Sequence, residues 1–116
     1  MATKINPRWA NRALRKKYQQ RFRLQNAPCA ICHGRLGEID YTTSNPKAPL
    51  GFVIDEIIPI SKYQLGGYDS PRQAAEDFNN VQPAHRICNQ MKGNKINYVY
   101  GGSKPQALVN VLDGEW

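Results

Sequence analysis

Two short pairs of metal-ligating residues, far apart in the sequence, place the strongest constraint on how this chain can fold. Cys29 and Cys32 form a C-x-x-C pair, and His85 and Cys88 form an H-x-x-C pair of the same spacing. This spacing lets two side chains reach one metal ion from a single turn, and three thiolates with one imidazole are a ligand set typical of structural zinc. The two pairs use every cysteine of the chain. We therefore predict a structural Zn²⁺ site that joins the pairs and holds a small domain closed.

The C-x-x-C pair has other known uses, and each fits the rest of the sequence less well. Together with His33 it matches the attachment pattern of c-type haem. Such proteins are exported, whereas we expect no signal peptide here, because no apolar segment follows the first basic residues. A thioredoxin-like redox pair is disfavoured because no βαβ pattern surrounds it. A free buried cysteine beside a core histidine is the remaining alternative to zinc.

The length of 116 residues fits a single domain, residues 1–116. We expect its core at about residues 8–95 and a C-terminal extension at residues 96–116. No apolar run is long enough for a transmembrane helix. An odd number of cysteines, three, favours metal binding in a reducing compartment over disulfide bonds. A cytoplasmic location without a membrane partner is therefore expected.

The beginning of the chain is strongly basic. The net charge is +7, no acidic residue precedes Glu38, and half of all lysines and arginines fall within residues 1–23. Asn6 and Pro7 are typical of a helix start, and the apolar pattern after them predicts a helix over residues 7–24. The basic face of this helix is either a solvated surface or, as we expect, a contact for nucleic acid. Its predicted phosphate contacts are Arg12, Arg15 and Lys16.

Two adjacent carboxylates, Asp55 and Glu56, interrupt an apolar run in the middle of the chain. A buried carboxylate needs a cation or hydrogen-bond donors to offset its lost hydration, so the pair predicts a divalent-metal site. The sequence predicts a strand over residues 51–55, with residues 57–60 as its hairpin partner or continuation. Pro59 would require an edge or a bulge in this arrangement.

The remaining predicted elements are short. They are a strand at residues 38–41, a helix from Ser70 or Pro71 to Glu76, a helix over residues 86–92 closed by Gly93, and a helix over residues 105–112. Together with the basic helix and the central strand they predict an α+β fold.

The order of these motifs resembles that of the HNH endonuclease family, of the zinc-knuckle kind found in bacteriophages and bacterial defence systems. The matching features are the C-x-x-C pair, Asp-Glu-Ile-Ile-Pro at 55–59, Asn-Val-Gln-Pro at 80–83 and His-x-x-Cys-Asn-x-x-Lys-Gly at 85–93. The resemblance covers about residues 8–95. It implies a small ββα-metal (His-Me finger) fold, in which a β-hairpin and a helix hold one catalytic divalent cation.

The resemblance also implies roles for single residues. Asp55 at the end of the strand and Asn89 on the last helix would bind the catalytic cation, which would be Mg²⁺, Mn²⁺ or Ni²⁺. Asn80 would orient the hairpin through hydrogen bonds, and Arg86 and Lys92 would face phosphates. A hard cation with few protein ligands keeps positions open for water and for a phosphate oxygen, which agrees with phosphodiester hydrolysis.

Glu56 departs from the family pattern, which usually has Asp-His with the histidine as general base. His85 is used by the predicted zinc site and His33 lies beside the other pair, so neither is assigned as its replacement. A carboxylate is a weaker base than an imidazole at neutral pH. Three interpretations stay open, in which Glu56 is the catalytic base, a further metal ligand or an inactivating change.

These observations predict a metal-dependent endonuclease that nicks or cuts double-stranded DNA with low sequence specificity. If the phage resemblance holds, the enzyme would act in DNA packaging beside a terminase, in the host cytoplasm. A zinc-stabilised nucleic-acid-binding module without catalysis is the main alternative, and a zinc-containing adaptor that binds protein is a third. The combination of Asp55, Glu56 and Asn89 favours the enzyme, because binding alone does not require it.

Overall fold

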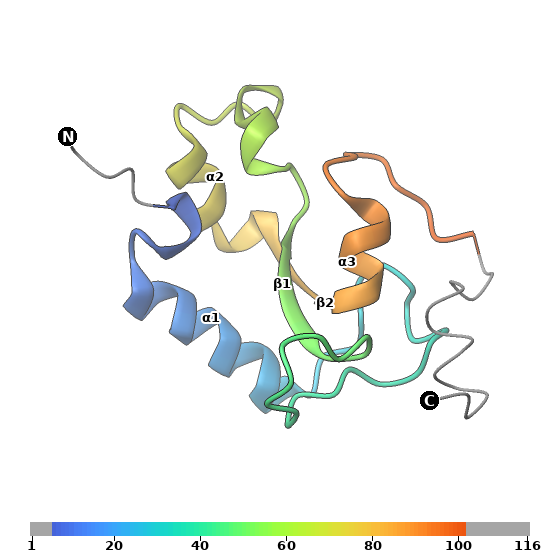
Figure 1. The fold of residues 1–116 in the computed structure, drawn as a ribbon. Helices are drawn as coiled ribbons and strands as arrows, with labels where there is room; N and C mark the ends of the chain where they lie inside the picture. Colours follow the sequence, from blue (N-terminus) through green and yellow to red (C-terminus); the bar gives the residue numbers. More distant parts are fainter. Residues whose placement is uncertain (1–5, 102–116) are drawn as a thin grey trace.

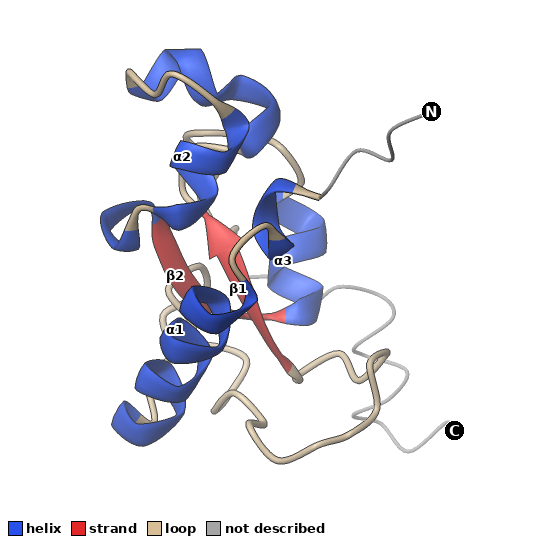
Figure 2. Cartoon of the chain, turned by 90° about the vertical axis from the view of Figure 1, so that its left-hand side faces the viewer, coloured by secondary structure: helices blue, strands red, loops and turns tan. Residues whose placement is uncertain are grey.

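Two short strands, β1 (Phe52–Glu56) and β2 (Val81–His85), form the centre of the fold and pair antiparallel. The computed structural model describes residues 6–101. The sheet lies between two helices, α1 and α3, and a third helix, α2, packs near one end of it (Figures 1 and 2). The bounds of these helices are Arg12–Gln25 for α1, Pro71–Glu76 for α2 and Arg86–Lys92 for α3. Short 3₁₀ helices are η1 (Pro7–Trp9), η2 (Ile60–Gly66) and η3 (Phe78–Asn80). The described chain is therefore a small α+β fold.

The predicted strand over residues 51–55 is confirmed as β1, but its predicted partner is wrong. Residues 57–60 turn away from β1 at Pro59 and lead into η2. The partner is β2, in a register that places Asp55 opposite Gln82. This strand was not predicted, because Pro83 lies inside it and proline is rare in strands. Pro83 is tolerated because β2 is an edge strand of a two-stranded sheet.

The predicted strand at residues 38–41 is reduced to a single bridge, in which Asp40 pairs with Gly51 in parallel. The Asp40 side chain explains why pairing stops there. Its Oδ1 atom accepts hydrogen bonds from the backbone N–H groups of Thr42 and Thr43, at 3.0 and 3.1 Å. This local turn competes with an extended conformation.

The predicted helix over residues 7–24 is confirmed in its main part and interrupted near its start. Asn6 caps η1, and α1 begins only after Asn11, whose side chain caps the first turn of α1. A second capping asparagine stops the first turn and starts a new helix. Asn26, in the left-handed conformation with φ of 45°, ends α1.

The other two predicted helices within the described residues are confirmed. Ser70 caps the start of α2, and α3 ends at Gly93, where a positive φ of 57° favours glycine. The helix predicted over residues 105–112 lies outside the described residues. Within residues 6–101, no helix is both long and apolar enough to span a membrane.

Two apolar clusters hold these elements together. One packs Phe22 of α1 against Ile54 and Val81 of the sheet. The other surrounds the three cysteines and includes Ile31, Leu36, Ile39 and Tyr100. The predicted metal ligands thus lie inside a core cluster, where solvent is excluded.

Candidate functional site

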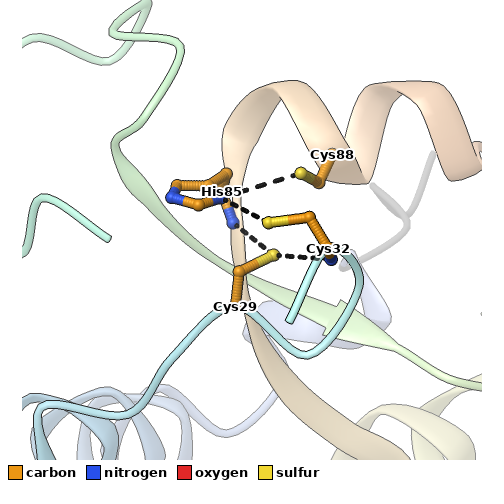
Figure 3. A group of neighbouring side chains, drawn as sticks. All are labelled: Cys29, Cys32, His85 and Cys88. Atoms are coloured by element: carbon orange, nitrogen blue, oxygen red, sulfur yellow. Dashed lines mark hydrogen bonds between the residues drawn. The ribbon is translucent and has the colours of Figure 1, made fainter. Parts of the chain in front are cut away.

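The four predicted zinc ligands come together as one buried cluster, with their side chains pointing toward one another (Figure 3). Cys29 and Cys32 lie on the turn that follows α1, His85 is the last residue of β2, and Cys88 lies in α3. Their ligand atoms all lie within 4.8 Å of one another. The His85 Nδ1 atom is 3.4 Å from Cys32 Sγ and 3.7 Å from Cys88 Sγ. Zinc bonds of about 2.0–2.3 Å in a tetrahedron give ligand separations of about 3.6 Å. The cluster can therefore hold a zinc ion.

The surroundings of the cluster orient its ligands. His85 Nε2 lies 3.1 Å from the carbonyl oxygen of Glu38. Donation from Nε2–H to this carbonyl leaves the Nδ1 lone pair facing the sulfur atoms, as in metal-binding histidines. The backbone N–H groups of Cys32 and His85 donate to Cys29 Sγ, at 3.5 and 3.4 Å. These hydrogen bonds favour the thiolate, which is the form that binds metal.

The protonation of the thiols also favours a bound cation. The hydrogen bond with Cys88 lowers the pKa of Cys29 to about 3, although burial opposes this change. The same hydrogen bond, burial and the charge on Cys29 raise the pKa of Cys88. Without a cation, the charge of one thiolate therefore makes deprotonation of the next thiol unfavourable. A divalent ion removes this conflict because it compensates the charges.

Asp55 is buried, with 4% of its surface exposed, and faces α3. Lys92 Nζ donates to its Oδ1 atom at 3.2 Å, and Gln82 Nε2 donates to its Oδ2 atom at 2.8 Å. Lys92 Nζ also donates to the backbone carbonyl of Glu56 at 2.9 Å. Burial raises the pKa of Asp55, and the bonds from Gln82 and Lys92 oppose part of that rise. The carboxylate is thus held in place, with lone pairs left for a cation.

Glu56 is equally buried but faces the N-terminal helices, because successive residues of a strand point to opposite sides. Its Oε1 atom accepts from Arg8 Nη2 at 2.8 Å and from Arg8 Nε at 2.9 Å. Its Oε2 atom accepts from Arg15 Nη2 at 3.2 Å. Burial lowers the pKa of Arg15, and the ion pair with Glu56 opposes this change. Both oxygens of Glu56 are therefore already engaged by guanidinium groups.

Asp55 and Glu56 both line one cavity of about 660 Å³. All residues of β1 line it, so it runs along the strand, and η1, α1, the start of η2 and the end of α3 supply its other walls. Asn89 lines it from α3. Asp55 and Glu56 of β1 therefore share a single cavity with Asn89 of α3.

Asn80 links the end of β1 to α2. Its Nδ2 atom donates to the carbonyl oxygens of Ile58 and Ala74, both at 3.0 Å, and its Oδ1 atom accepts from the Ile58 N–H group at 2.8 Å. Only 2% of Asn80 is exposed. The side chain thus fixes the segment that follows the two carboxylates.

Replacing Asn80 with alanine is expected to lower the free energy of unfolding by about 3 kcal/mol, because one buried and two part-buried backbone groups lose their partner at about 1–3 kcal/mol each. Asn80→Asp should destabilise at least as much, since it puts an oxygen where two carbonyl groups need a donor. Denaturant unfolding measures both. The exposed neighbour Asn79 supplies the control, and Asn79→Ala should change stability by less than about 0.5 kcal/mol. Equal effects of Asn79→Ala and Asn80→Ala would contradict this role.

The predicted phosphate contacts divide into exposed and buried residues. Arg12 and Lys16 are exposed on α1, and Arg86 is half-buried at the start of α3. Arg15 and Lys92 are buried, and their charges face the two carboxylates instead of solvent. The exposed face of α1 therefore carries fewer of the predicted phosphate contacts than the sequence indicates.

Sequence reasoning missed two residues of the site, Arg8 and Gln82. Gln82 can be assigned to the site only from the register of the sheet, which places it opposite Asp55. Arg8 binds Glu56 across a sequence separation of 48 residues, and nothing in the local pattern indicates that pairing. Both contacts depend on tertiary structure.

Comparisons of the chain with protein-family models, with curated proteins and with solved structures found no match. The residues of the site and their arrangement therefore carry the functional conclusion.

Proposed function

We propose that the chain is a metal-dependent endonuclease that hydrolyses phosphodiester bonds of double-stranded DNA. The observation that carries this proposal is the shared cavity of Asp55 and Asn89, two oxygen ligands from β1 and α3. A module that only binds DNA has no need to bring them together. The succession of β1, β2 and α3 along the chain agrees with a ββα-metal fold of the HNH kind (Figure 1).

The donor set suits a hard divalent cation such as Mg²⁺, Mn²⁺ or Ni²⁺. Asp55 offers a carboxylate oxygen and Asn89 an amide oxygen, which are ligands that hard cations accept. When bound, such a cation would stabilise negative charge on the phosphate and on the leaving 3′ oxygen. Gln82 and Lys92 hold the Asp55 carboxylate in one orientation, so little ordering of this ligand is needed on binding.

Glu56 stands where the family pattern has its general base. Its two oxygens are bound by Arg8 and Arg15. Accepting a proton from water therefore requires one of these ion pairs to open. This feature favours a second candidate function, a zinc-stabilised module that binds DNA without cutting it.

Contacts with DNA are expected mainly from exposed basic residues, including Arg12 and Lys16. The net charge of +7 supports binding to a polyanion. Affinity that comes from phosphate contacts falls steeply with salt because bound counterions are released. Binding with little dependence on sequence but strong dependence on salt is therefore part of the proposal.

The experiment that tests the proposal is cleavage of supercoiled plasmid with added Mg²⁺, Mn²⁺, Ni²⁺ or Zn²⁺. The parent should produce nicked or linear DNA with at least one of these cations. Asp55→Asn and Asn89→Ala should each reduce the rate by about 100-fold or more, because the first removes the negative charge and the second an oxygen atom from the ligands of the ion that stabilises the transition state. The initial rate of nicking is the measurement.

Two exposed residues provide matched controls for these variants. Asp69→Asn and Asn79→Ala make the same chemical changes away from the cavity and should cut like the parent. If all four variants cut equally well, Asp55 and Asn89 do not hold a catalytic cation. If the parent binds DNA in a gel-shift assay but no cation yields nicked product, the non-catalytic module is the correct function.

A further inference from the structure

Glu56 bridges two arginines that come from different elements. Arg8 lies on η1 and Arg15 on α1, and the buried carboxylate accepts hydrogen bonds from both. Both arginines line the same cavity as Asp55. The carboxylate therefore holds two guanidinium groups together at the wall of the candidate active site.

The charges at this wall do not cancel. Three cations, Arg8, Arg15 and Lys92, form ion pairs with two carboxylates, Asp55 and Glu56. One positive charge is left over within this group. The Arg8 side chain is 40% exposed, so solvent compensates part of this charge. The remaining excess of positive charge at the cavity wall attracts an anion.

Arg15 also has hydrogen-bonding capacity that the described residues leave unused. Only 6% of Arg15 is exposed, and its Nη1 atom is buried without a hydrogen-bond partner within residues 6–101. A buried donor without an acceptor costs about 1–3 kcal/mol. An oxygen atom of a ligand at this place would remove that cost.

The segment that could make room for such an oxygen is η1. None of its residues is buried, and Arg8 and Trp9 both line the cavity. The Arg15 guanidinium carbon lies 5.9 Å from the centre of the Trp9 ring. A three-residue turn with no buried side chain can shift at low cost, and such a shift would bring Arg15 Nη1 into contact with the cavity.

We propose that Arg15 and Arg8 form a phosphate-binding subsite at the wall of this cavity, and that Glu56 is its positioning residue. The ligand is the phosphodiester group of a DNA strand, whose oxygen atoms accept charge-assisted hydrogen bonds from arginine. Arg15 donates to the phosphate through Nη1, while its Nη2 atom stays hydrogen-bonded to Glu56. When η1 shifts, the Arg8 guanidinium moves with it and stays in contact with the phosphate. The identity of the ligand rests on the proposed nuclease function, whereas the anion site itself does not.

The test uses thymidylyl-(3′→5′)-thymidine, a dinucleotide with a single phosphodiester, in buffer without added divalent cation and without chelator. The zinc cluster then stays intact and no cleavage is required. Titration is followed by ¹⁵N NMR of the arginine side chains and of the Trp9 indole. The parent should show saturable shifts of the Arg15 and Trp9 signals. Arg15→Gln should weaken binding at least tenfold, judged from the remaining Trp9 signal.

Two further variants and one further ligand complete the design. Arg15→Lys keeps the charge but lacks the fork of donors, so it should bind at least threefold more weakly than the parent. Arg72→Gln makes the same change as Arg15→Gln on the exposed face of α2 and should bind like the parent. Inorganic phosphate should shift the same signals if the site recognises the phosphate group alone. Zinc content and thermal unfolding show whether each variant is folded.

The proposal is overturned if the dinucleotide and phosphate give no saturable shift in the folded parent. It is also overturned if folded Arg15→Lys and Arg15→Gln both bind like the parent. Failure of plasmid cleavage would leave these titrations unaffected, so the subsite and the nuclease function are tested separately. If Arg15→Lys binds normally while Arg15→Gln does not, the site requires only a positive charge and the assignment of Nη1 is wrong.

Discussion

Replacing His85 with asparagine is expected to abolish zinc binding and to leave most of the chain unfolded at room temperature. Structural zinc contributes apparent binding free energies of about 10–16 kcal/mol in small domains, which exceeds the total stability of most domains. The cluster joins the turn after α1 to β2 and α3, so its loss separates the elements that form the core. Metal analysis should find about one zinc per chain in the parent and little in the variant. Circular dichroism should show the loss of folded structure.

The second histidine of the chain is a matched control. His33 is exposed and follows the C-x-x-C pair directly, with a left-handed φ of 55° that asparagine also adopts readily. His33→Asn should therefore keep both the zinc and the melting temperature of the parent. A His85→Asn chain that retains one zinc and melts like the parent would rule out the cluster as a structural metal site. Lowering the pH should release zinc from the parent, because protons compete for the thiolates.

Replacing Lys92 with methionine is expected to reduce the free energy of unfolding by about 3–5 kcal/mol in the absence of added divalent cation. The variant removes the ammonium group that compensates Asp55 in a buried site and leaves the carboxylate charge with only Gln82 as donor. Lys47→Met makes the same change at an exposed position and should alter stability by less than about 0.5 kcal/mol. Denaturant unfolding at fixed ionic strength compares the two.

Two additional measurements separate a lost charge pair from lost packing. The reduction in the free energy of unfolding caused by Lys92→Met should become smaller as the pH falls. The reason is that burial already raises the pKa of Asp55 and loss of Lys92 raises it further. A protonated Asp55 in the folded state then removes the buried charge. Adding Mg²⁺ or Mn²⁺ should also restore part of the stability if Asp55 binds the cation, by about 2.7 kcal/mol at 100 times the dissociation constant. If the loss of unfolding free energy in Lys92→Met depends on neither the pH nor the added cation, Lys92 stabilises the fold through the packing of its apolar stem alone.

Local patterns in the sequence predicted the parts of the fold that depend on local interactions. The start of α2 at Ser70 and the end of α3 at Gly93 follow from capping, which involves residues only a few positions apart. The members of the cysteine and histidine cluster could be predicted for a similar reason, because each pair has its own spacing. The start of α1 after Asn11 depends on the same kind of local capping, but it was not predicted.

The parts that could not be predicted depend on long-range pairing. β2 could not be predicted from local patterns because it contains Pro83, and proline is rare in strands. Proline is accepted in β2 because this strand lies at the edge of the sheet, which only the tertiary structure reveals. The burial of Arg15 and Lys92 has the same origin. A lysine or arginine is normally exposed, and only the placement of Asp55 and Glu56 on opposite sides of β1 draws these two side chains inward.

The pairing of Phe52 with His85 has a consequence for how the chain tolerates changes in length. The buried cluster of three cysteines and His85 fixes His85, and the ladder then fixes every pair up to Glu56 and Val81. A slip of one residue would turn the side chains of the slipped strand to the opposite face of the sheet, and Asp55 and Glu56 would exchange their lysine and arginine partners. One inserted residue within β1 should therefore disrupt the ion pairs of Asp55 and Glu56. The exposed part of the connection between β1 and β2, around Leu65 to Asp69, should accept insertions.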